Sequence, residues 1–108
     1  VITCPDLVSV CQAVVSDKLM EPLYSSPAGP ISPIDILYGH RGYIEQGKVY
    51  MAHKTGFTYT SLLKAFQEAG FTSFFGGSLP KTFDLWLIAF KQGRTEEDLK
   101  KAAGEFLP

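Results

Sequence analysis

The sequence predicts one mixed domain of the α/β or α+β class over residues 1–108, and three features of its pattern carry this prediction. A short apolar run opens the chain, a longer strand-like run near its end is apolar on both faces, and segments with helical periodicity separate the two. The resulting order is strand, helix, loop, helix, helix, strand, strand, helix, with no internal repeat. With 45% hydrophobic side chains, the chain is suited to one modest core.

The start of the chain predicts a strand followed by an amphipathic helix. Val1 to Cys4 is an apolar strand-like run, and Pro5-Asp6 then supplies a strand stop and a helix cap. From Leu7 to Val15, apolar residues recur on one face at helical spacing. We therefore expect the first strand to lead directly into the first helix.

A proline-rich loop and a second helix are expected next. Residues 20–32 contain three prolines and one glycine, which are unfavourable for a regular ladder or helix. The part from Tyr24 to Pro30 is either a lid over a pocket or a simple surface crossing. Ser32 as cap, Pro33 at the first helical position and the Asp35 carboxylate at the third predict a helix over about 33–46, which ends before Gly47.

The third helix has the most complete set of local signals. Thr58 is its expected cap, and Phe57 and Leu62 fit a hydrophobic staple around that cap. Gly70 is placed to end the helix in a left-handed conformation, with Phe71 folding back on Phe66 as in a Schellman motif. The expected inward face consists of Leu62, Leu63 and Phe66.

Two strands and a last helix complete the predicted fold. We expect a strand over 71–75, a connection over 76–80 that contains Gly76-Gly77, and a longer strand over 82–90. Both faces of the longer strand are apolar apart from Asp84, so this strand should be central and covered on both sides. The last helix should start at a Thr95 cap and bury a set of apolar residues, namely Leu99, Ala102, Ala103 and Phe106.

Charge and apolar runs argue against several classes of partner. Ten basic and eleven acidic residues leave no sustained positive surface for nucleic acid or an anionic membrane. No apolar run approaches the roughly 20 residues of a membrane span, and no signal peptide opens the chain. The sequence predicts a soluble, cytoplasmic protein that binds neither nucleic acid nor membrane.

The cysteines and histidines predict no metal centre. Cys4 and Cys11 are close in sequence across a strand-to-helix junction, so we expect free, buried thiols rather than a bridge. His40 and His53 are distant in sequence from both cysteines and from each other. We therefore expect no metal ion in this chain.

Six sequence runs stand in order across most of the chain. They are Cys4-Pro5-Asp6-Leu7, Ser26-Pro27-Ala28-Gly29-Pro30, Ile36-Leu37-Tyr38-Gly39-His40-Arg41, Met51-Ala52-His53-Lys54-Thr55-Gly56-Phe57-Thr58, Ala69-Gly70-Phe71 and Phe83-Asp84-Leu85-Trp86. Each run alone is weak, but their order is moderately specific. Together they resemble the carboxy-terminal region of class I S-adenosylmethionine-dependent methyltransferases of the type 11 group.

The resemblance implies a seven-stranded sheet in which a last, antiparallel strand lies between the fifth and sixth strands. The run 1–4 is then similar to the fifth strand, 71–75 to the sixth and 82–90 to the seventh. As an isolated fragment, the chain should be α+β: a small mixed three-stranded sheet, its last strand central and antiparallel, flanked by about four helices.

The resemblance also implies that the cofactor site lies outside this chain. In the family, a glycine-rich turn follows the first strand and an acidic residue that binds the ribose follows the second, and both would precede Val1. Gly76-Gly77 has no helix amino terminus behind it, so it is not a cofactor loop. We expect S-adenosylmethionine to be the cofactor of a parent enzyme, no cofactor-binding residues here, and no activity of this chain alone.

In such an enzyme the carboxy-terminal segment shapes the side of the site that holds the methyl acceptor. A histidine there can accept a proton, because its ordinary pKa is near neutrality. The alternative is structural: His40 caps or packs locally, and His53 fixes the turn into the third helix. No catalytic residue is assigned, and the candidate substrate-binding residues are Tyr38, His40, Arg41, His53, Lys54 and Thr55.

Two further residues have a structural and a functional interpretation. Asp84 is either a ligand contact near the sheet edge or a structural hydrogen-bond partner of a loop amide, Arg41 or Lys54. Trp86 and the phenylalanines follow the strand and helix periods, which favours core positions over a substrate cage.

Three functions remain open at this point. The first is a methyltransferase fragment that acts on an unknown acceptor. The second is a non-catalytic interaction or dimerisation domain, and the third is a small independent enzyme that uses the two histidines. Without the first four strands of the family sheet, the strand over 1–4 would have an unpaired outer edge, which predicts a homodimer through edge-to-edge strand pairing or strand exchange.

Overall fold

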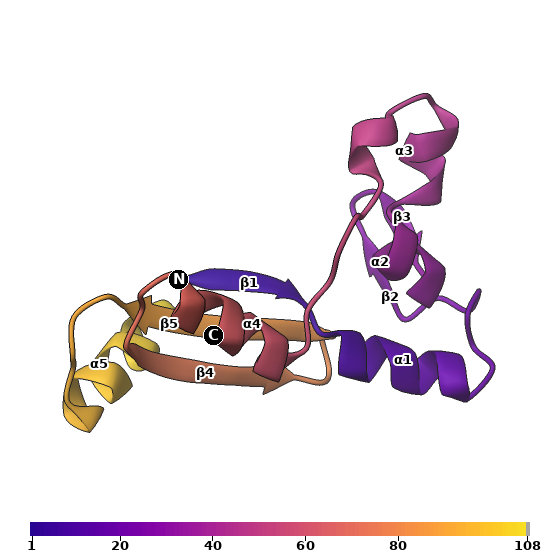
Figure 1. Cartoon of the computed structure of the whole chain (residues 1–108). Helices are drawn as coiled ribbons and strands as arrows, with labels where there is room; N and C mark the ends of the chain where they lie inside the picture. The colour runs from indigo at the N-terminus through magenta and orange to yellow at the C-terminus, as the bar shows by residue number, and fades with distance from the viewer. Residues whose placement is uncertain (108) are drawn as a thin grey trace. The chain divides into compact units, whose positions relative to one another are not determined.

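The computed structural model describes residues 1–107, which form two compact units (Figure 1). Unit 1 comprises residues 1–6 and 57–107, and unit 2 comprises residues 7–56. The predicted mixture of helices and strands is confirmed, with a three-stranded sheet in unit 1 and a two-stranded sheet in unit 2. Within the described residues, no helix is both long enough and apolar enough to span a bilayer.

The sheet of unit 1 has the strand order β1-β5-β4. Its strands are β1 (Ile2–Pro5), β4 (Ser73–Leu79) and β5 (Asp84–Phe90), and both outer strands are antiparallel to β5. The last strand in sequence is therefore the central one, as predicted. Its residues are apolar on both faces, which explains this position. Leu85 and Leu87 are buried on one face, and Ile88 is buried on the other.

Helix α4 (Tyr59–Glu68) packs its apolar stripe on one face of this sheet (Figure 1). Leu62 is buried against Leu85 and Leu87 in the centre of the core. The predicted end of the helix is confirmed, since the amide of Phe71 donates to the carbonyl of Phe66 at 3.0 Å and their rings lie 4.9 Å apart. These contacts fix where the chain leaves α4 and enters β4.

Helix α5 (Glu96–Phe106) begins at the predicted Thr95 cap, whose hydroxyl accepts from the Asp98 amide at 3.1 Å. Its packing is looser than predicted. Leu99, Ala102 and Ala103 are only half-buried, and the side chain of Phe106 is 54% exposed. The prediction that Phe106 is buried is therefore wrong, because the helix is longer than the sheet contact that covers it.

The predicted connection over 76–80 is also wrong, because β4 continues through Gly76-Gly77 to Leu79. A side chain at Gly76 would collide with the backbone of Trp86 and Leu87 on the neighbouring strand. Glycine is therefore required here by the close approach of two strands rather than by a turn.

Unit 2 contains one long helix, a hairpin and a cluster of short helices. Its elements are α1 (Leu7–Val15), β2 (Tyr24–Ser26), β3 (Gly29–Ile31), α2 (Pro33–Tyr38), α3 (Arg41–Glu45) and the 3₁₀ helix η1 (Val49–Met51). The position of α1 is as predicted. The described residues contain five α-helices rather than about four.

The proline-rich loop contains a short hairpin, so the prediction that it has no ladder is wrong. Strands β2 and β3 pair around a two-residue turn, with Ser26 opposite Gly29. The Ser26 hydroxyl accepts from the Ala28 amide at 3.1 Å and donates to the Gly29 carbonyl at 3.0 Å. Gly29 has a φ of 105°, which glycine adopts without strain, and a two-stranded ladder has outer edges that tolerate Pro30.

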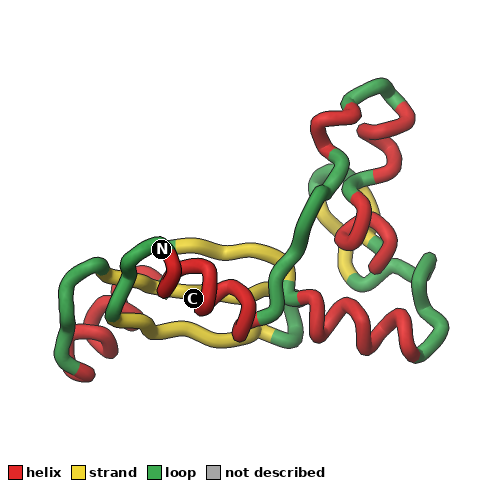
Figure 2. Tube along the Cα trace, viewed as in Figure 1, coloured by secondary structure: helices red, strands yellow, loops and turns green. Residues whose placement is uncertain are grey.

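The helix predicted over 33–46 is two helices, α2 and α3, with a break at Gly39 and His40 (Figure 2). Gly39 has a φ of 107°, and a side chain there would collide with the carbonyl of Met51. The break is therefore imposed by a close approach between Gly39 and a segment twelve residues away in sequence.

Replacing Gly76 with alanine should destabilise unit 1 by about 1–3 kcal/mol, because the new methyl group overpacks the β4–β5 ladder. Gly77→Ala is the matched control, since no atom lies within 4 Å of a methyl group at that position. Guanidinium unfolding followed by Trp86 fluorescence measures both variants. Equal stability of the two variants would contradict the assigned strand register.

Candidate functional site

Unit 2 has few buried apolar side chains, and two of its buried side chains are polar. Within residues 7–56, the buried apolar side chains are Val10, Pro33 and Ile36, whereas Ser32 and Asp35 are 3% and 6% exposed. A buried carboxylate is costly unless it is paired and hydrogen-bonded. The contacts of Asp35 therefore govern how this unit holds together.

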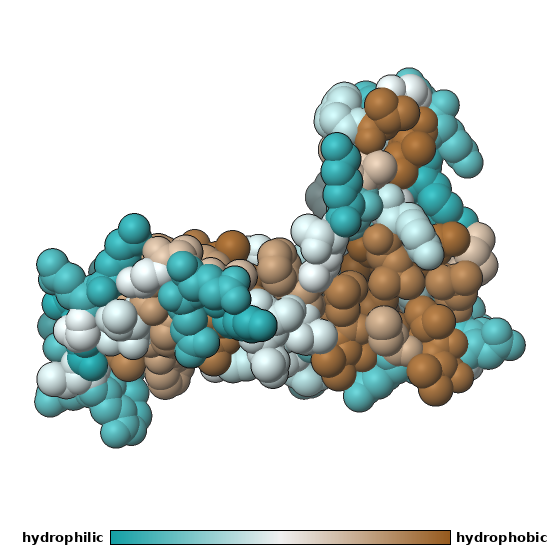
Figure 3. All heavy atoms as spheres, in the orientation of Figure 1, coloured by the Kyte–Doolittle hydropathy of each residue, from teal (hydrophilic) through white to brown (hydrophobic). Residues whose placement is uncertain are grey.

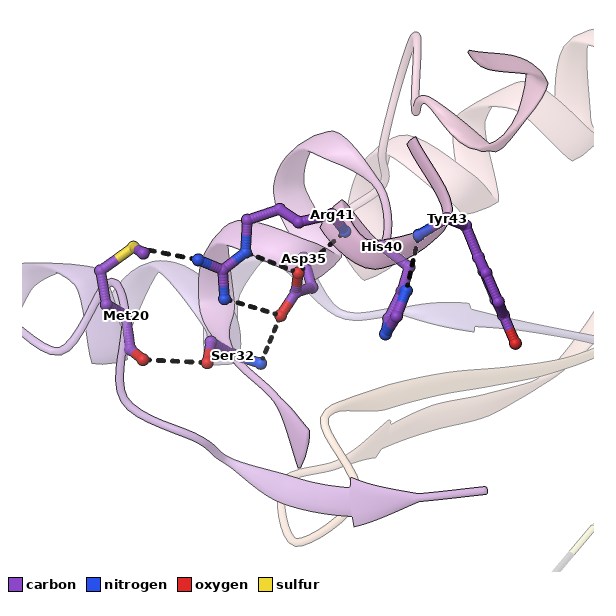
Figure 4. Close-up of polar contacts among 6 residues, drawn as sticks. All are labelled: Met20, Ser32, Asp35, His40, Arg41 and Tyr43. Atoms are coloured by element: carbon purple, nitrogen blue, oxygen red, sulfur yellow. Dashed lines mark hydrogen bonds and ion pairs between the residues drawn. The ribbon is translucent and has the colours of Figure 1, made fainter. Parts of the chain in front are cut away.

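Asp35 binds both ends of its own helix (Figure 4). One carboxylate oxygen accepts from the Ser32 amide at 2.9 Å, before the helix begins. The other accepts from the Arg41 amide at 3.1 Å and from Nε of Arg41 at 2.9 Å, beyond the break at Gly39. One side chain thus fixes the start of α2 and the start of α3.

The charge on Asp35 is stabilised despite its burial. Burial alone would raise the pKa of its carboxyl, but the hydrogen bonds from the Arg41 side chain and from the Ser32 and Arg41 amides outweigh it and hold the pKa below its ordinary value. The Ser32 hydroxyl extends the network to the carbonyl of Met20 at 3.0 Å. The network therefore joins the loop after α1, at Met20, to the hairpin exit and the α2–α3 break.

His53 is bound to the end of α2 at two points. Its amide donates to the Tyr38 carbonyl at 3.1 Å, and its Nδ1 lies 2.6 Å from the Ile36 carbonyl. Both carbonyls belong to the last turn of α2, where helical partners are missing. Because a carbonyl only accepts, Nδ1 must carry the proton, and the unprotonated nitrogen of the neutral ring is Nε2.

His40 has the opposite arrangement. It caps α3, and its Nδ1 accepts from the Tyr43 amide at 3.3 Å. The neutral ring of His40 therefore carries its proton on Nε2, and its lone pair is already used. Of the two, His53 is therefore the histidine with a ring nitrogen, Nε2, whose lone pair is not used in a hydrogen bond within residues 1–107.

The structure brings together the two runs that supply the candidate substrate-binding residues. Gly39 packs against the backbone at Met51 and Ala52, and His53 bonds the end of α2, so the run 38–41 lies against the run 51–53. We call this contact the Gly39 junction. The Tyr38 side chain is 67% exposed, and Lys54 and Thr55 are exposed in the segment that follows His53.

The hydrogen bonds of His40, His53 and Arg41 test the structural roles that the sequence suggests for them. His40 does cap locally, as that alternative proposed. His53 bonds α2 rather than the turn into α4, so that part of the structural interpretation is wrong. Arg41, one expected partner of Asp84, is bound to Asp35.

Asp35 and Ser32 were recognised in the sequence only as helix-start signals. The spacing Ser32-Pro33-Ile34-Asp35 does predict the bond from Asp35 back to the Ser32 amide. The second half of the network depends on the break at Gly39, for which the local sequence offers no separate signal.

In unit 1 the buried carboxylate is Asp6 rather than Asp84, which is half-buried. Asp6 accepts from the Ser78 hydroxyl at 2.6 Å, and its amide donates to the Phe83 carbonyl at 2.8 Å. Burial, and then the charges of Asp84 and Asp6, raise the pKa of the Cys4 thiol. This thiol is therefore protonated and poorly reactive at neutral pH.

Both cysteines are free, but the prediction that both are buried is wrong, since Cys4 is half-buried and Cys11 is exposed. Helix α1 is apolar on more than one face, which leaves Cys11 on its outer side. Among residues 1–107, no three histidine, cysteine or acidic side chains gather in a way that would hold a metal ion.

Comparison with known proteins gives no assignment. No family model matches the chain, and neither a curated protein nor a solved structure is significantly similar to it. Function must therefore be argued from the fold and the Gly39 junction.

Asp35→Asn should destabilise unit 2 by about 1–3 kcal/mol at pH 7, because the variant loses a charge-assisted bond to Arg41. The folded pKa of Asp35 is lowered, so its stabilising effect is complete above the ordinary carboxyl pKa of about 3.9 and is lost as the pH falls through the lower folded value. The difference between wild type and variant should therefore shrink below about pH 4. Hydrogen exchange at the amides of α2 and α3 measures it.

Glu21→Gln removes an exposed carboxylate from the same unit and is the matched control. It should leave the exchange rates unchanged. Equal exchange in Asp35→Asn and Glu21→Gln would show that the Asp35 network does not stabilise unit 2.

Proposed function

We propose that this chain is the carboxy-terminal, acceptor-side part of a class I S-adenosylmethionine-dependent methyltransferase. The observation that carries the proposal is the strand order β1-β5-β4, with the last strand antiparallel between the other two. This is the order in which the fifth, seventh and sixth strands of such an enzyme lie, as the sequence resemblance implies. A last strand inserted between two earlier strands is more specific than a simple three-stranded meander.

The point at which unit 2 leaves the sheet also supports an acceptor-side role. Unit 2 begins at Leu7, directly after β1 ends at Pro5. In open sheets of α/β proteins, ligands bind beyond the carboxyl ends of the parallel strands. A segment that follows the end of such a strand in the chain is suited to hold an acceptor, and methyl transfer depends mainly on positioning and on excluding water.

The surface of unit 2 favours a neutral acceptor. Four basic residues (Lys18, Arg41, Lys48 and Lys54) balance four acidic ones (Asp17, Glu21, Asp35 and Glu45) within residues 7–56. Several large apolar side chains are exposed, including Val15, Val49 and Tyr50, and hydrophobic residues gather over α1 (Figure 3). Such a surface suits a small or apolar acceptor better than a polyanion.

In the proposed methyltransferase, residues outside this chain hold the cofactor. Gly76 and Gly77 lie within β4, and Gly76 is explained by its contact with the β5 backbone. A dinucleotide-type or adenosyl-binding turn instead precedes a helix amino terminus, where amides face the ligand. Gly76 is thus accounted for without a cofactor, and Gly77 lies in a strand rather than in such a turn.

S-adenosylmethionine and S-adenosylhomocysteine should therefore give no binding heat when titrated calorimetrically into the 108-residue chain. The expectation follows from the absence of a glycine-rich turn between a strand and a helix in residues 1–107. Saturable binding of either compound would contradict the proposal that the cofactor is held outside this chain, because residues with a structural explanation would then have to bind it.

A second candidate function, a dimerisation or interaction domain, is favoured by one observation. Among residues 1–107, β1 pairs only with β5, so its other edge is open. An open edge offers unpaired amides and carbonyls to another strand. We propose that two copies of the chain pair through β1.

Sedimentation of the chain should then give a concentration-dependent dimer, and Thr3→Lys should weaken it by placing a charge on the exposed edge strand. Thr60→Lys, on the exposed side of α4, adds the same charge elsewhere in unit 1 and should leave the dimer intact. A monomer at all concentrations, or equal effects of both variants, would rule out pairing through β1.

A further inference from the structure

Strand β4 (Ser73–Leu79) has an open edge. It is an outer strand of the unit 1 sheet, and among residues 1–107 it pairs with β5 alone (Figure 1). The strand has seven residues, whereas β1 at the opposite edge has four and ends in Pro5. Proteins commonly block an edge strand with a charged residue or a proline, and β4 contains neither. Its outer amides and carbonyls are therefore available to an added strand.

One face of the sheet beside β4 is partly uncovered. Helix α4 covers the face that carries Leu85 and Leu87. The opposite face carries Trp86, which is half-buried, and Gly77 is its partner in β4. No atom lies within 4 Å of a methyl group placed on Gly77, and Phe75, on the same face, is 37% exposed. The space over Gly77 therefore suits a large apolar side chain from a neighbouring strand.

A positive charge lies at the start of β4 on the same face. The hydroxyl of Ser73 accepts from the Arg94 amide at 2.8 Å. The guanidinium of Arg94 lies 5.0 Å from the centre of the Phe90 ring, and Phe90 is the β5 partner of Ser73. Within residues 1–107, Arg94 forms no ion pair, although Asp98 and Glu105 line the same hollow of about 240 Å³. Arg94 is thus placed to attract a carboxylate on an added strand.

We propose that β4 binds an extended segment of another protein as an added antiparallel strand, with an aromatic side chain over Gly77 and a carboxylate opposite Ser73. Both strand pairs of this sheet are antiparallel, and antiparallel pairing is the more stable kind. Because Gly77 and Ser73 are four residues apart on one face, the aromatic residue precedes the acidic one by four positions. The inference concerns unit 1 alone and does not depend on the proposed methyltransferase function.

The probe is the peptide acetyl-TFVTVET-amide, which has this spacing. Titrated into the isotope-labelled 108-residue chain, it should give saturable NMR shifts at the amides of β4 and should slow hydrogen exchange there. The peptide acetyl-TGVTVET-amide lacks the aromatic ring and should bind about tenfold more weakly. This comparison leaves the protein unchanged, so it does not depend on the folding of a variant.

The Arg94→Glu variant tests the charge. It should weaken binding of acetyl-TFVTVET-amide about threefold, because an exposed attraction is lost. A third peptide, acetyl-TFVTVKT-amide, should bind this variant better than it binds wild type, which a purely structural role of Arg94 does not predict. Lys64→Glu makes the same charge change on the exposed side of α4 and is the matched control. It should leave the affinities of all three peptides unchanged.

Shifts at β1 instead of β4, equal affinities of the phenylalanine and glycine peptides, or equal effects of the two variants would overturn the proposal. Shifts at β4 that grow with the concentration of the chain alone, before any peptide is added, would also overturn it. They would assign this edge to a second copy of the chain rather than to a segment of another protein.

Discussion

The hydrogen bonds of the Asp35 carboxylate are the constraint on which unit 2 depends. A unit of fifty residues with three buried apolar side chains cannot rely on apolar burial alone. Asp35 compensates by bonding Ser32 before α2 and Arg41 after the break, so that one charge closes the turn at Gly39. That turn in turn allows the segment around Met51 to approach and places His53 on the end of α2. The position of the one histidine with a free lone pair thus follows from a single buried ion pair.

The two units are stabilised in different ways, and the difference matches their proposed roles. Unit 1 is built around Leu62, Leu85 and Leu87, which form an ordinary core between a sheet and a helix. Unit 2 leaves apolar side chains such as Val15 and Tyr50 on its surface and buries the polar side chains of Ser32 and Asp35 beside a few apolar ones. Binding segments are commonly less stable than the scaffold that carries them, because they must expose the groups that bind. Unit 1, with its apolar core, and unit 2, with its buried Asp35 network, are consistent with a scaffold that carries an acceptor-side segment.

Local signals in the sequence were sufficient where the structure depends on neighbours in the chain. The Schellman end of α4 at Gly70 and Phe71 and the Thr95 cap of α5 involve residues only a few positions apart, and both were predicted. Two glycine-containing segments differ from their predictions, because glycine in a sequence indicates a turn or passes for an ordinary helix residue. Gly76 serves a close approach between strands, and Gly39 serves one between distant segments; neither partner is visible in the local pattern. The six candidate site residues belong to two separate runs of the sequence, and only the fold shows that the Gly39 junction brings those runs together.

The central claim, that this chain is the acceptor side of a methyltransferase, is tested most directly on the natural polypeptide. An antibody raised against the 108-residue chain would recover that polypeptide from its source after irradiation with radiolabelled S-adenosylmethionine. The account predicts a labelled polypeptide whose intact mass exceeds the 11.9 kDa of this chain. An unlabelled polypeptide of the mass of this chain would contradict it.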